Sequence, residues 1–342
     1  MDKLGIGVIG LGIMGENYVQ VYQQHPHTEV RAVVNRSEER LHRVGDKYNI
    51  PANNRYTDHR KMLERNDIDA VCVATPDFAH TQFVLDALSA GKHVLVEKPM
   101  TISTKEADDI LRAVKDTGLK LQVAYSHRWL PAYYEARQRI QNGEIGKPLV
   151  GYARKNDTIW VATEMINWTA QTAPTFFLNS HDVDLMRWYF DSEAVEARAY
   201  GVKEVLVKRG IDTYDMVQGQ VKFASGAIAT FESGWIYPNT FPTIVDSFVE
   251  VIGSAGHIHL DRKCESLEIS TEKAFTYPKT FLYGQIFGKI HGAFKLCLDA
   301  FVDCILEDKE PVTNAYAGRQ VTAILEAMIK SANQGGEIVK IQ

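Results

Sequence analysis

The sequence predicts an α/β protein of two domains. An N-terminal doubly wound parallel sheet with helices on both faces precedes an α+β domain built on a mostly antiparallel open sheet. The length of 342 residues exceeds what one hydrophobic core usually serves. Short apolar runs alternate with helical patterns up to Tyr125, and beyond it strand-like runs follow one another with tight turns. We therefore expect domains at residues 1–125 and 126–342.

The N-terminal strands are predicted from five apolar runs separated by segments with helical spacing. They are "LGIGVIG", "EVRAVV", "IDAVCVAT", "HVLVE" and "KLQVAY", at residues 4–10, 29–34, 68–75, 93–97 and 120–125. In one intervening segment Val84, Ala87 and Leu88 share a helical face, and Gly91 is a suitable left-handed end for that helix. This alternation predicts a parallel sheet covered on both faces.

The second domain is predicted from consecutive strand-like runs, which favour antiparallel pairing. These runs are "MVQGQVKFASGAIATFESGW" and "IVDSFVEVIGSAGHIHLD". Two long helical patterns, near 285–307 and 314–333, lead into the strand-like "EIVKIQ". We expect one face of the sheet to lack covering helices and to be buried against another subunit, so the sequence predicts a homodimer or homotetramer.

Composition is that of a soluble globular enzyme, with 45% hydrophobic residues, 24% charged residues and a net charge of −5. The net charge provides no basic field for nucleic acid, and no apolar stretch approaches the length of a membrane span. The four cysteines form no CxxC pair. We expect a cytoplasmic protein with neither a nucleic-acid nor a membrane partner.

A complete G-x-G-x-x-G pattern lies at the first strand, formed by Gly10, Gly12 and Gly15 with Ile13 and Met14 between them. The pattern alone is weak evidence, but here it follows an apolar strand and opens a helix. That context lets the backbone approach a pyrophosphate and offer it helix N-terminal N–H groups. The sequence therefore predicts a Rossmann dinucleotide-binding domain.

The choice of dinucleotide depends on the end of the second strand, about 20 residues after the glycines. An acidic residue there would bind the ribose hydroxyls, but this chain has Asn35, followed by Arg36 and Ser37. A neutral side chain does not repel a 2′-phosphate, and Arg36 and Ser37 have groups that can bind one. Alternatively, Arg36 stacks on adenine and Ser37 caps the next helix. We expect NADP or NAD, with NADP slightly favoured.

The segments "GVIGLGIMG", "CVATPDFAHTQFVLDALSAGKHVLVEKPM" and "NSHDVDLMRW" together resemble the Gfo/Idh/MocA oxidoreductases, named for glucose-fructose oxidoreductase and inositol dehydrogenase. The resemblance covers nearly the whole chain. It implies an NAD(P)-dependent dehydrogenase or reductase that acts on CH–OH groups of a sugar, inositol or related polyol. It also implies that Lys98 of Glu97-Lys98-Pro99 lies beside the nicotinamide, in a cleft between the domains.

Position in the sheet supports the same placement, because ligands gather at the carboxyl ends of parallel strands. The turn after "HVLVE" and the glycine turn therefore face one crevice. Thr75, Pro76 and His80 belong to the same rim, where Pro76 would shape the nicotinamide side. His80 has an alternative interpretation as a polar residue in the first turn of a helix.

Oxidation of an alcohol needs a proton acceptor from the protein, and the candidates are Lys98 and His181. His181 opens the helical pattern "HDVDLMRWYF", with Asp184 one turn on, and by resemblance it is the family's catalytic histidine. Phe177 stands where the family commonly has an aspartate. Either Asn179 or Asp184 compensates, or the chemistry differs. The alternative function is a non-catalytic dinucleotide-binding regulator or sensor.

Other polar and aromatic residues are candidates for binding a polyol. Donors and acceptors come from Tyr125, His127, Arg128, Lys155, Asn156 and Asn179, and flat apolar surfaces come from Trp160, Trp168 and Trp235. Of these, Asn156 and Arg128 are favoured by the resemblance. No metal site is expected, because HExxH is absent and "HIH" at His257 and His259 is strand alternation.

Overall fold

The computed structural model describes residues 3–342, which form two compact units. The first unit contains the described residues up to Tyr125 together with Gln285–Arg319, and the second contains Ser126–Gly284 and Gln320–Gln342. The division after Tyr125 coincides with the predicted boundary. Residues 285–319, however, belong to the first unit and not to the second, which corrects the predicted range.

The contacts of residues 285–319 explain this correction. Phe294 stacks on Tyr18 with ring centroids 5.3 Å apart. The Gln122 side chain donates to the Cys297 carbonyl at 2.7 Å, and Val123 N donates to the Thr313 carbonyl at 2.7 Å. Helical periodicity reveals which face of a helix is buried, but not which distant sheet covers it.

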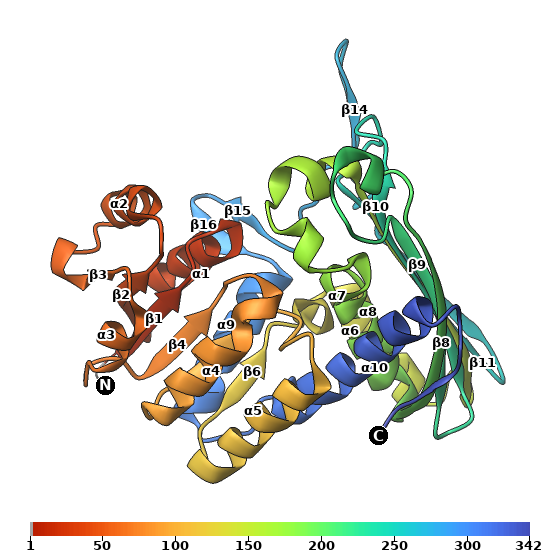
Figure 1. The fold of residues 1–342 in the computed structure, drawn as a ribbon, viewed down its shortest axis with the longest axis horizontal. Coiled ribbons are helices and arrows are strands. Elements are labelled where there is room, and N and C mark those ends of the chain that lie inside the picture. The colour runs from red at the N-terminus through yellow and green to blue at the C-terminus, as the bar shows by residue number, and fades with distance from the viewer. Residues whose placement is uncertain (1–2) are drawn as a thin grey trace. The chain divides into compact units, whose positions relative to one another are not determined.

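The first unit is built on a parallel sheet with the strand order β3-β2-β1-β4-β5-β6. The order runs outward from β1 in both directions, which is the Rossmann arrangement. In Figure 1, α4 and α5 lie side by side in front of this sheet. The elements are β1 (Leu4–Ile9), α1 (Ile13–Gln24), β2 (Thr28–Val34), α2 (Glu38–Lys47), β3 (Arg55–Tyr56), α3 (His59–Leu63), β4 (Ala70–Val73), α4 (His80–Ser89), β5 (His93–Val96), α5 (Thr104–Thr117), β6 (Leu121–Val123), β15 (Gly284–Ile286), β16 (Lys289–His291) and α9 (Ala293–Leu306).

The predicted end of α4 at Gly91 is confirmed. Gly91 has φ +76°. Its N–H donates to the Leu88 carbonyl and that of Lys92 to the Ala87 carbonyl, both at 3.0 Å. These are the two hydrogen bonds of a Schellman motif, which needs a residue that tolerates the left-handed conformation.

The helix predicted to begin near Gln285 begins only at Ala293, because a hairpin of β15 and β16 precedes it. The turn residues Phe287 and Gly288 have φ values of +49° and +78°. Two consecutive residues with positive φ suit the tight turn of a hairpin and cannot continue a right-handed helix. The prediction for residues 285–292 was therefore wrong.

The second unit is built on a mixed sheet with the order β12-β11-β7-β10-β9-β8-β17. Only the β7–β10 pair is parallel among these neighbours in the described chain, so the sheet is mostly antiparallel, as predicted. The elements are α6 (Pro131–Gln141), β7 (Pro148–Thr158), α7 (Pro174–Phe177), α8 (Asn179–Phe190), β8 (Ala194–Val202), β9 (Met216–Phe223), β10 (Ile228–Tyr237), β11 (Val245–Gly253), β12 (His257–Asp261), β13 (Ile269–Ser270), β14 (Phe275–Thr276), α10 (Ala315–Asn333, whose first residues belong to the first unit) and β17 (Val339–Lys340).

Helices cover one face of this sheet. A Cβ on Gly151 of β7 would meet Met186 and Phe190 of α8, and a Cβ on Gly219 of β9 would meet Met328 of α10. Figure 1 shows α7, α8 and α10 on the same side of the strands. Because strand side chains alternate, odd-numbered residues of β7 face the helices and even-numbered residues face the opposite side. No helix in the described residues is long and apolar enough to cross a membrane.

Candidate active site

The carboxyl ends of three strands in the first unit lie side by side. Ile9 of β1 pairs with Val73 of β4, and Val73 pairs with Val96 of β5. The next residue along each strand begins the glycine turn, the Thr75–Pro76 turn and the turn that carries Lys98. Register alone therefore places these three turns at one edge of the sheet, where parallel sheets bind ligands.

The glycine turn has little room for side chains at two positions and open space at the third. A Cβ on Gly10 would lie 2.6 Å from the Ala74 carbonyl oxygen, and one on Gly15 would lie 1.7 Å from the Gly10 carbonyl oxygen. A Cβ on Gly12 would meet nothing within 4 Å. Gly12 caps α1 without a side-chain hydrogen bond, so the backbone there suits the approach of a pyrophosphate. Ile13 and Met14 open that helix, and Ile13 is exposed.

The end of β2 is joined to the glycine turn by Asn35. Its Oδ1 accepts from Leu11 N at 3.1 Å, and its Nδ2 donates to the Ser37 carbonyl at 3.1 Å. The Ser37 hydroxyl accepts from Arg40 N at 3.3 Å, so Ser37 caps α2. This was the alternative interpretation of Ser37. Arg36 is exposed beside it, next to the edge where adenosine binds in this fold.

Glu97, before Lys98, is buried and held from two sides. Tyr18 of α1 donates its hydroxyl to Oε1 at 2.7 Å, and Lys98 N donates to Oε2 at 3.1 Å. Burial raises the pKa of Glu97, against the opposing effects of the Lys98 charge and the Tyr18 hydrogen bond. Lys98 is half-buried, and its peptide bond to Pro99 is cis.

His80 connects the Thr75–Pro76 turn with the turn that carries Lys98 and Pro99. Its Nε2 lies 2.9 Å from the Thr75 carbonyl oxygen, and its Nδ1 lies 2.9 Å from the Pro99 carbonyl oxygen. The ring is buried, and burial lowers the pKa of His80 to about 4, although the two carbonyls favour the protonated form. His80 thus holds the Thr75–Pro76 turn against the turn that follows Lys98.

In the second unit, two predicted site residues meet. His127 lies in the 3₁₀ turn Ser126–Trp129, and His181 lies in the first turn of α8, as predicted. Their rings are edge to face with centroids 3.8 Å apart. Arg262 Nη1 lies 2.9 Å from His127 Nε2, and Glu265 binds the same guanidinium. Only Leu178 separates α7 from α8, so the first turn of α8 directly follows another short helix.

A buried ion pair lies next to His181 in the sequence. Lys155 of β7 donates to Asp182 Oδ1 at 2.8 Å. Asn179 donates to Asp182 Oδ2 at 3.0 Å and to the Glu232 carbonyl at 3.1 Å. Both charged side chains are buried, and two hydrogen bonds satisfy the carboxylate.

Arg128 and Asp184 form a second ion pair, in which the carboxylate is buried. The guanidinium donates from Nε and from Nη2 to the two carboxylate oxygens, each at 2.7 Å. The Arg128 Cζ also lies 5.2 Å from the centre of the Trp188 ring. Both oxygens of Asp184 are therefore engaged by Arg128.

Comparison with known proteins identifies these two units. Residues 4–125 match the NAD-binding Rossmann fold of the GFO_IDH_MocA oxidoreductase family, and residues 137–341 match its C-terminal alpha/beta domain. The chain belongs to the Gfo/Idh/MocA oxidoreductase family. The predicted resemblance is therefore confirmed, as are the fold class and the assignment to nicotinamide-dependent oxidoreductases.

Relatives within the Gfo/Idh/MocA family include polyol dehydrogenases. The chain is 29% identical over 282 residues to scyllo-inositol 2-dehydrogenase (NAD(+)) of Bacillus subtilis, covering 81% of this chain and 78% of the relative. It is 24% identical to myo-inositol 2-dehydrogenase of Thermotoga maritima, covering 96% of both chains. Scyllo-inositol dehydrogenase of Lactobacillus casei, solved with NAD(H) and scyllo-inositol, has the same fold, with a TM-score of 0.84, 21% identity and 99% coverage of both chains.

Phe177 is the departure of this Gfo/Idh/MocA chain from the family pattern, and the structure shows what the aromatic ring does. It packs against Trp168 and Trp235, with ring centroids 5.8 Å and 6.0 Å away. Ala162 and Leu206 complete the apolar cluster. A carboxylate at this position would lie against aromatic rings and would lose its hydration there.

Asn156 requires a correction, because it does not lie with the other predicted substrate residues. Lys155 reaches Asp182 on the helix-covered face of the sheet, and its neighbour therefore points to the opposite face. There Asn156 donates to Glu232 Oε1 at 2.6 Å and to the Tyr237 hydroxyl at 3.1 Å. Asn156 and His181 therefore do not line one site.

The remaining aromatic candidates divide by burial. Tyr125, the last residue of the first unit, has a fully buried side chain and does not present its hydroxyl to solvent. Trp235 is fully buried and donates to the Tyr214 carbonyl at 2.7 Å. Trp168 is half-buried, and Trp160, after β7, is the most exposed of these three tryptophans.

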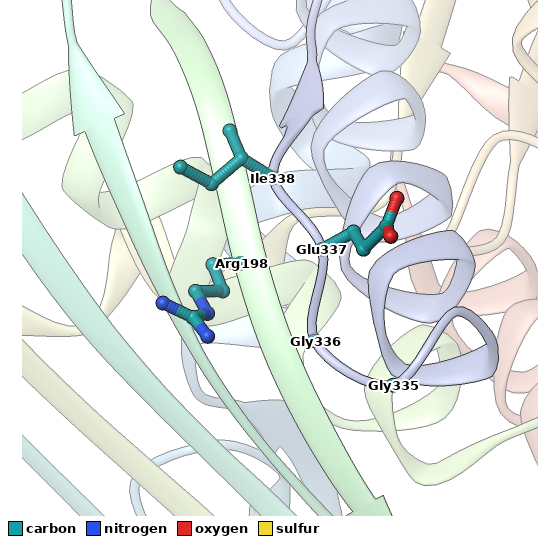
Figure 2. A pocket seen from close by; sticks show the side chains of 5 residues that line it. All are labelled: Arg198, Gly335, Gly336, Glu337 and Ile338. Atoms are coloured by element: carbon teal, nitrogen blue, oxygen red, sulfur yellow. The ribbon is translucent and has the colours of Figure 1, made fainter.

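Two other features lie apart from the candidate site. His257 and His259 alternate on β12 as predicted, and the described residues contain no group of three or more His, Cys, Asp or Glu placed to hold a metal. Figure 2 shows an open pocket in the second unit, lined by Arg198, Gly335, Gly336, Glu337 and Ile338. None of its lining residues was predicted to bind cofactor or substrate.

Sequence reasoning missed Asp182, Arg262 and Glu265. Asp182 follows His181 directly, and its place on the buried face of an amphipathic helix was a usable signal. Arg262 and Glu265 follow a strand far along the chain and carry no recognisable motif. Only the folded chain brings Arg262 to His127.

Proposed function

We propose that this chain transfers a hydride between a nicotinamide dinucleotide and a hydroxyl-bearing carbon of an inositol, a sugar or a related polyol. The observation that supports this best is the shared sheet edge of the glycine turn and Lys98, set by the pairing of Ile9, Val73 and Val96. Two of its relatives are named as inositol dehydrogenases, and these names guide the choice of substrate class.

The glycine turn, Lys98 and His181 each have a role in this proposal. The N–H groups of Ile13 and Met14 hold the pyrophosphate at the start of α1, where Gly12 leaves open space. A bound dinucleotide would accept the hydride from the carbinol carbon. Lys98 binds the reacting oxygen and stabilises negative charge on it, and His181 takes the hydroxyl proton.

We further propose a choice of dinucleotide. Both groups of the Asn35 carboxamide are engaged with backbone, so the side chain puts no negative charge beside the adenosine ribose. Arg36 is exposed and available to a 2′-phosphate, whereas Ser37 is used as a helix cap. We propose that NADP binds at least as tightly as NAD, with Arg36 as the phosphate ligand. Several relatives are named or described with NAD, so the titration must include both.

The proposal is tested by turnover. The purified chain is incubated with inositol isomers, aldoses, anhydro sugars and simple alcohols, each with NAD⁺ and NADP⁺, and the reduced nicotinamide is followed by absorbance. We expect oxidation of at least one cyclic polyol and none of ethanol. Binding of dinucleotide with no turnover on any member would support the alternative function, a non-catalytic regulator or sensor, which Phe177 favours.

We also propose a homodimer formed through the helix-free face of the second unit's sheet. Val150 of β7 pairs with Ile228 of β10 and with Ile252 of β11, so the three form one apolar row. They are 37%, 45% and 39% exposed, respectively. Apolar rows of this kind on an open sheet are normally covered by a second subunit. A homotetramer is the alternative assembly.

Light scattering after size exclusion tests the assembly. The parent chain is expected at twice its monomer mass of 38.5 kDa or more. Ile228→Glu should shift it toward the monomer, whereas the same change at exposed Ile338, which is outside the row, should not. A monomeric parent would refute the proposed interface.

Finally, we propose that the chain functions in the reducing cytoplasm. Its four cysteines are free, as they would be in that compartment. Cell fractionation tests this location.

A further inference from the structure

We propose that Arg262 is a positioning residue that fixes His127 as the neutral Nδ1–H tautomer, so that His181 is the imidazole of the pair that gains and loses the proton. The chemical consequence rests on the proposed function, but the tautomer itself can be tested without any substrate. Neither Arg262 nor its partner Glu265 stands out in the sequence.

The tautomer follows from hydrogen-bond chemistry. Arg262 Nη1 lies 2.9 Å from His127 Nε2. A guanidinium only donates and stays protonated in proteins, so Nε2 must accept. An imidazole nitrogen that accepts carries no proton, and a neutral ring keeps its single proton on the other nitrogen. His127 therefore carries its proton on Nδ1.

Arg262 is itself held in place. Its Nε and Nη2 donate to Glu265 Oε1 at 3.1 Å and 2.9 Å, and Glu265 Oε2 accepts from Thr280 N and Phe281 N at 2.7 Å and 2.8 Å. The guanidinium is nearly buried and Glu265 is buried. Five donated or accepted bonds, including the one to His127, leave Nη1 aimed at the ring with little freedom to turn away.

Charges around His127 also disfavour a proton on it. Arg262 faces it from the end of β12, and Lys279 is bound to the Arg262 carbonyl. Tyr133 of α6 lies beside it with ring centroids 5.9 Å apart, and His181 of α8 lies across it. Protonation of His127 would break its bond to Arg262 and place two cations together.

The consequence falls on His181. The centroids of the two imidazole rings are 3.8 Å apart, so electrostatic repulsion opposes a positive charge on both rings at once. Because His127 is fixed as neutral, His181 changes charge without competition from its neighbour. Asp182, which follows His181 on α8, is neutralised by Lys155 of β7, so it does not change which of the two histidines gains the proton.

Nuclear magnetic resonance of the full chain labelled in its histidines tests the proposal. Signals are assigned with His127→Gln and His181→Gln. In the parent we expect His127 to show a protonated Nδ1 and to keep that state between about pH 5 and 8, the range in which an ordinary histidine titrates. In Arg262→Met we expect His127 to titrate in that range. Arg262→Lys, which restores a donor, should recover part of the parent behaviour, and Arg198→Met on exposed β8 should change nothing.

A His127 that titrates in the parent, or that carries its proton on Nε2, would overturn the proposal even if the chain is an active dehydrogenase. Once a substrate is found, the pH profile of turnover is expected to show one ionisation from this histidine pair in the parent and two in Arg262→Met. Absence of turnover in every variant would refute the proposed function and leave the tautomer result standing.

Discussion

The Tyr18 hydroxyl donates a 2.7 Å hydrogen bond to Glu97 Oε1, which ties the helix that begins at the glycine turn to the residue before Lys98. Both side chains are buried. The position of Lys98 relative to the dinucleotide turn is therefore set by a hydrogen bond inside the first unit and not by a free loop. This contact connects two motifs that lie about 80 residues apart in the sequence.

Tyr18→Phe should weaken the fold and the activity together. The change leaves a buried carboxylate oxygen without its donor, at a cost of about 1–3 kcal/mol in the free energy of unfolding. Urea denaturation measures that loss, and turnover should fall because Glu97 no longer holds the Lys98 turn as firmly. Tyr134→Phe, on the exposed side of α6, is the control. Equal stability of parent and Tyr18→Phe would contradict the prediction.

Lys98→Met should abolish most turnover while dinucleotide binding survives. The methionine keeps the apolar part of the side chain but removes the ammonium, and loss of one acid–base or electrostatic group costs on the order of 10² to 10⁴ in rate. Fluorescence titration measures dinucleotide affinity, which depends on the glycine turn and should change little. Lys115→Met on exposed α5 is the matched control. Turnover of Lys98→Met at the parent rate would exclude Lys98 from the reaction.

Asn35→Asp should shift the preference from NADP toward NAD. One carboxylate oxygen can still accept from Leu11 N, but the other would meet the Ser37 carbonyl and must turn away from it. That oxygen becomes available to ribose hydroxyls and repels a 2′-phosphate. We expect the ratio of the two dissociation constants to change about tenfold or more, which is about 1.4 kcal/mol. An unchanged ratio would show that the end of β2 does not select the dinucleotide.

His80→Gln should flatten the dependence of stability on acid pH. The pKa of His80 falls from 6.5 to about 4 on folding, chiefly through burial, so the unfolded chain binds more protons between these values. Stability from this group is therefore fully present above pH 6.5 and is lost as the pH falls toward 4, up to about 3 kcal/mol. Denaturation at several pH values measures the difference between parent and variant. His42→Gln, at an exposed position of α2, should follow the parent curve.

Phe177→Asp should destabilise the second unit. The carboxylate would replace a ring packed against Trp168 and Trp235, and the loss of the ring alone costs about 2–4 kcal/mol for a partly buried phenylalanine. Thermal unfolding measures this loss. Phe177→Leu keeps the apolar contact and should cost less than half as much. A fully stable aspartate variant with an altered pH profile of turnover would instead support a simple exchange of catalytic groups.

Several features of this protein follow from the sequence alone because they depend on local chemistry. The glycine turn was predictable, since Gly10 and Gly15 have no space for a Cβ and a strand and a helix flank them. The same holds for the Schellman end of α4 at Gly91 and for the strands β1, β2, β4, β5 and β6 of the first sheet, which the apolar runs reveal, whereas the two-residue strand β3 gave no such signal. The common edge of Gly10 and Lys98 also followed, because parallel strands align their carboxyl ends.

Other features were decided only by the tertiary structure, because they join segments whose contact no local pattern encodes. Residues 285–319 pack on the first unit through Phe294 and Cys297, although their helical periodicity fits either unit equally well. Lys155 and Asn156 are adjacent polar residues in the sequence, yet alternation along β7 places them on opposite faces, and only the position of α8 determines which face holds His181. Arg262 and His127 lie 135 positions apart in the sequence. No local motif marks this pair, and the two residues meet only when the chain between them has folded.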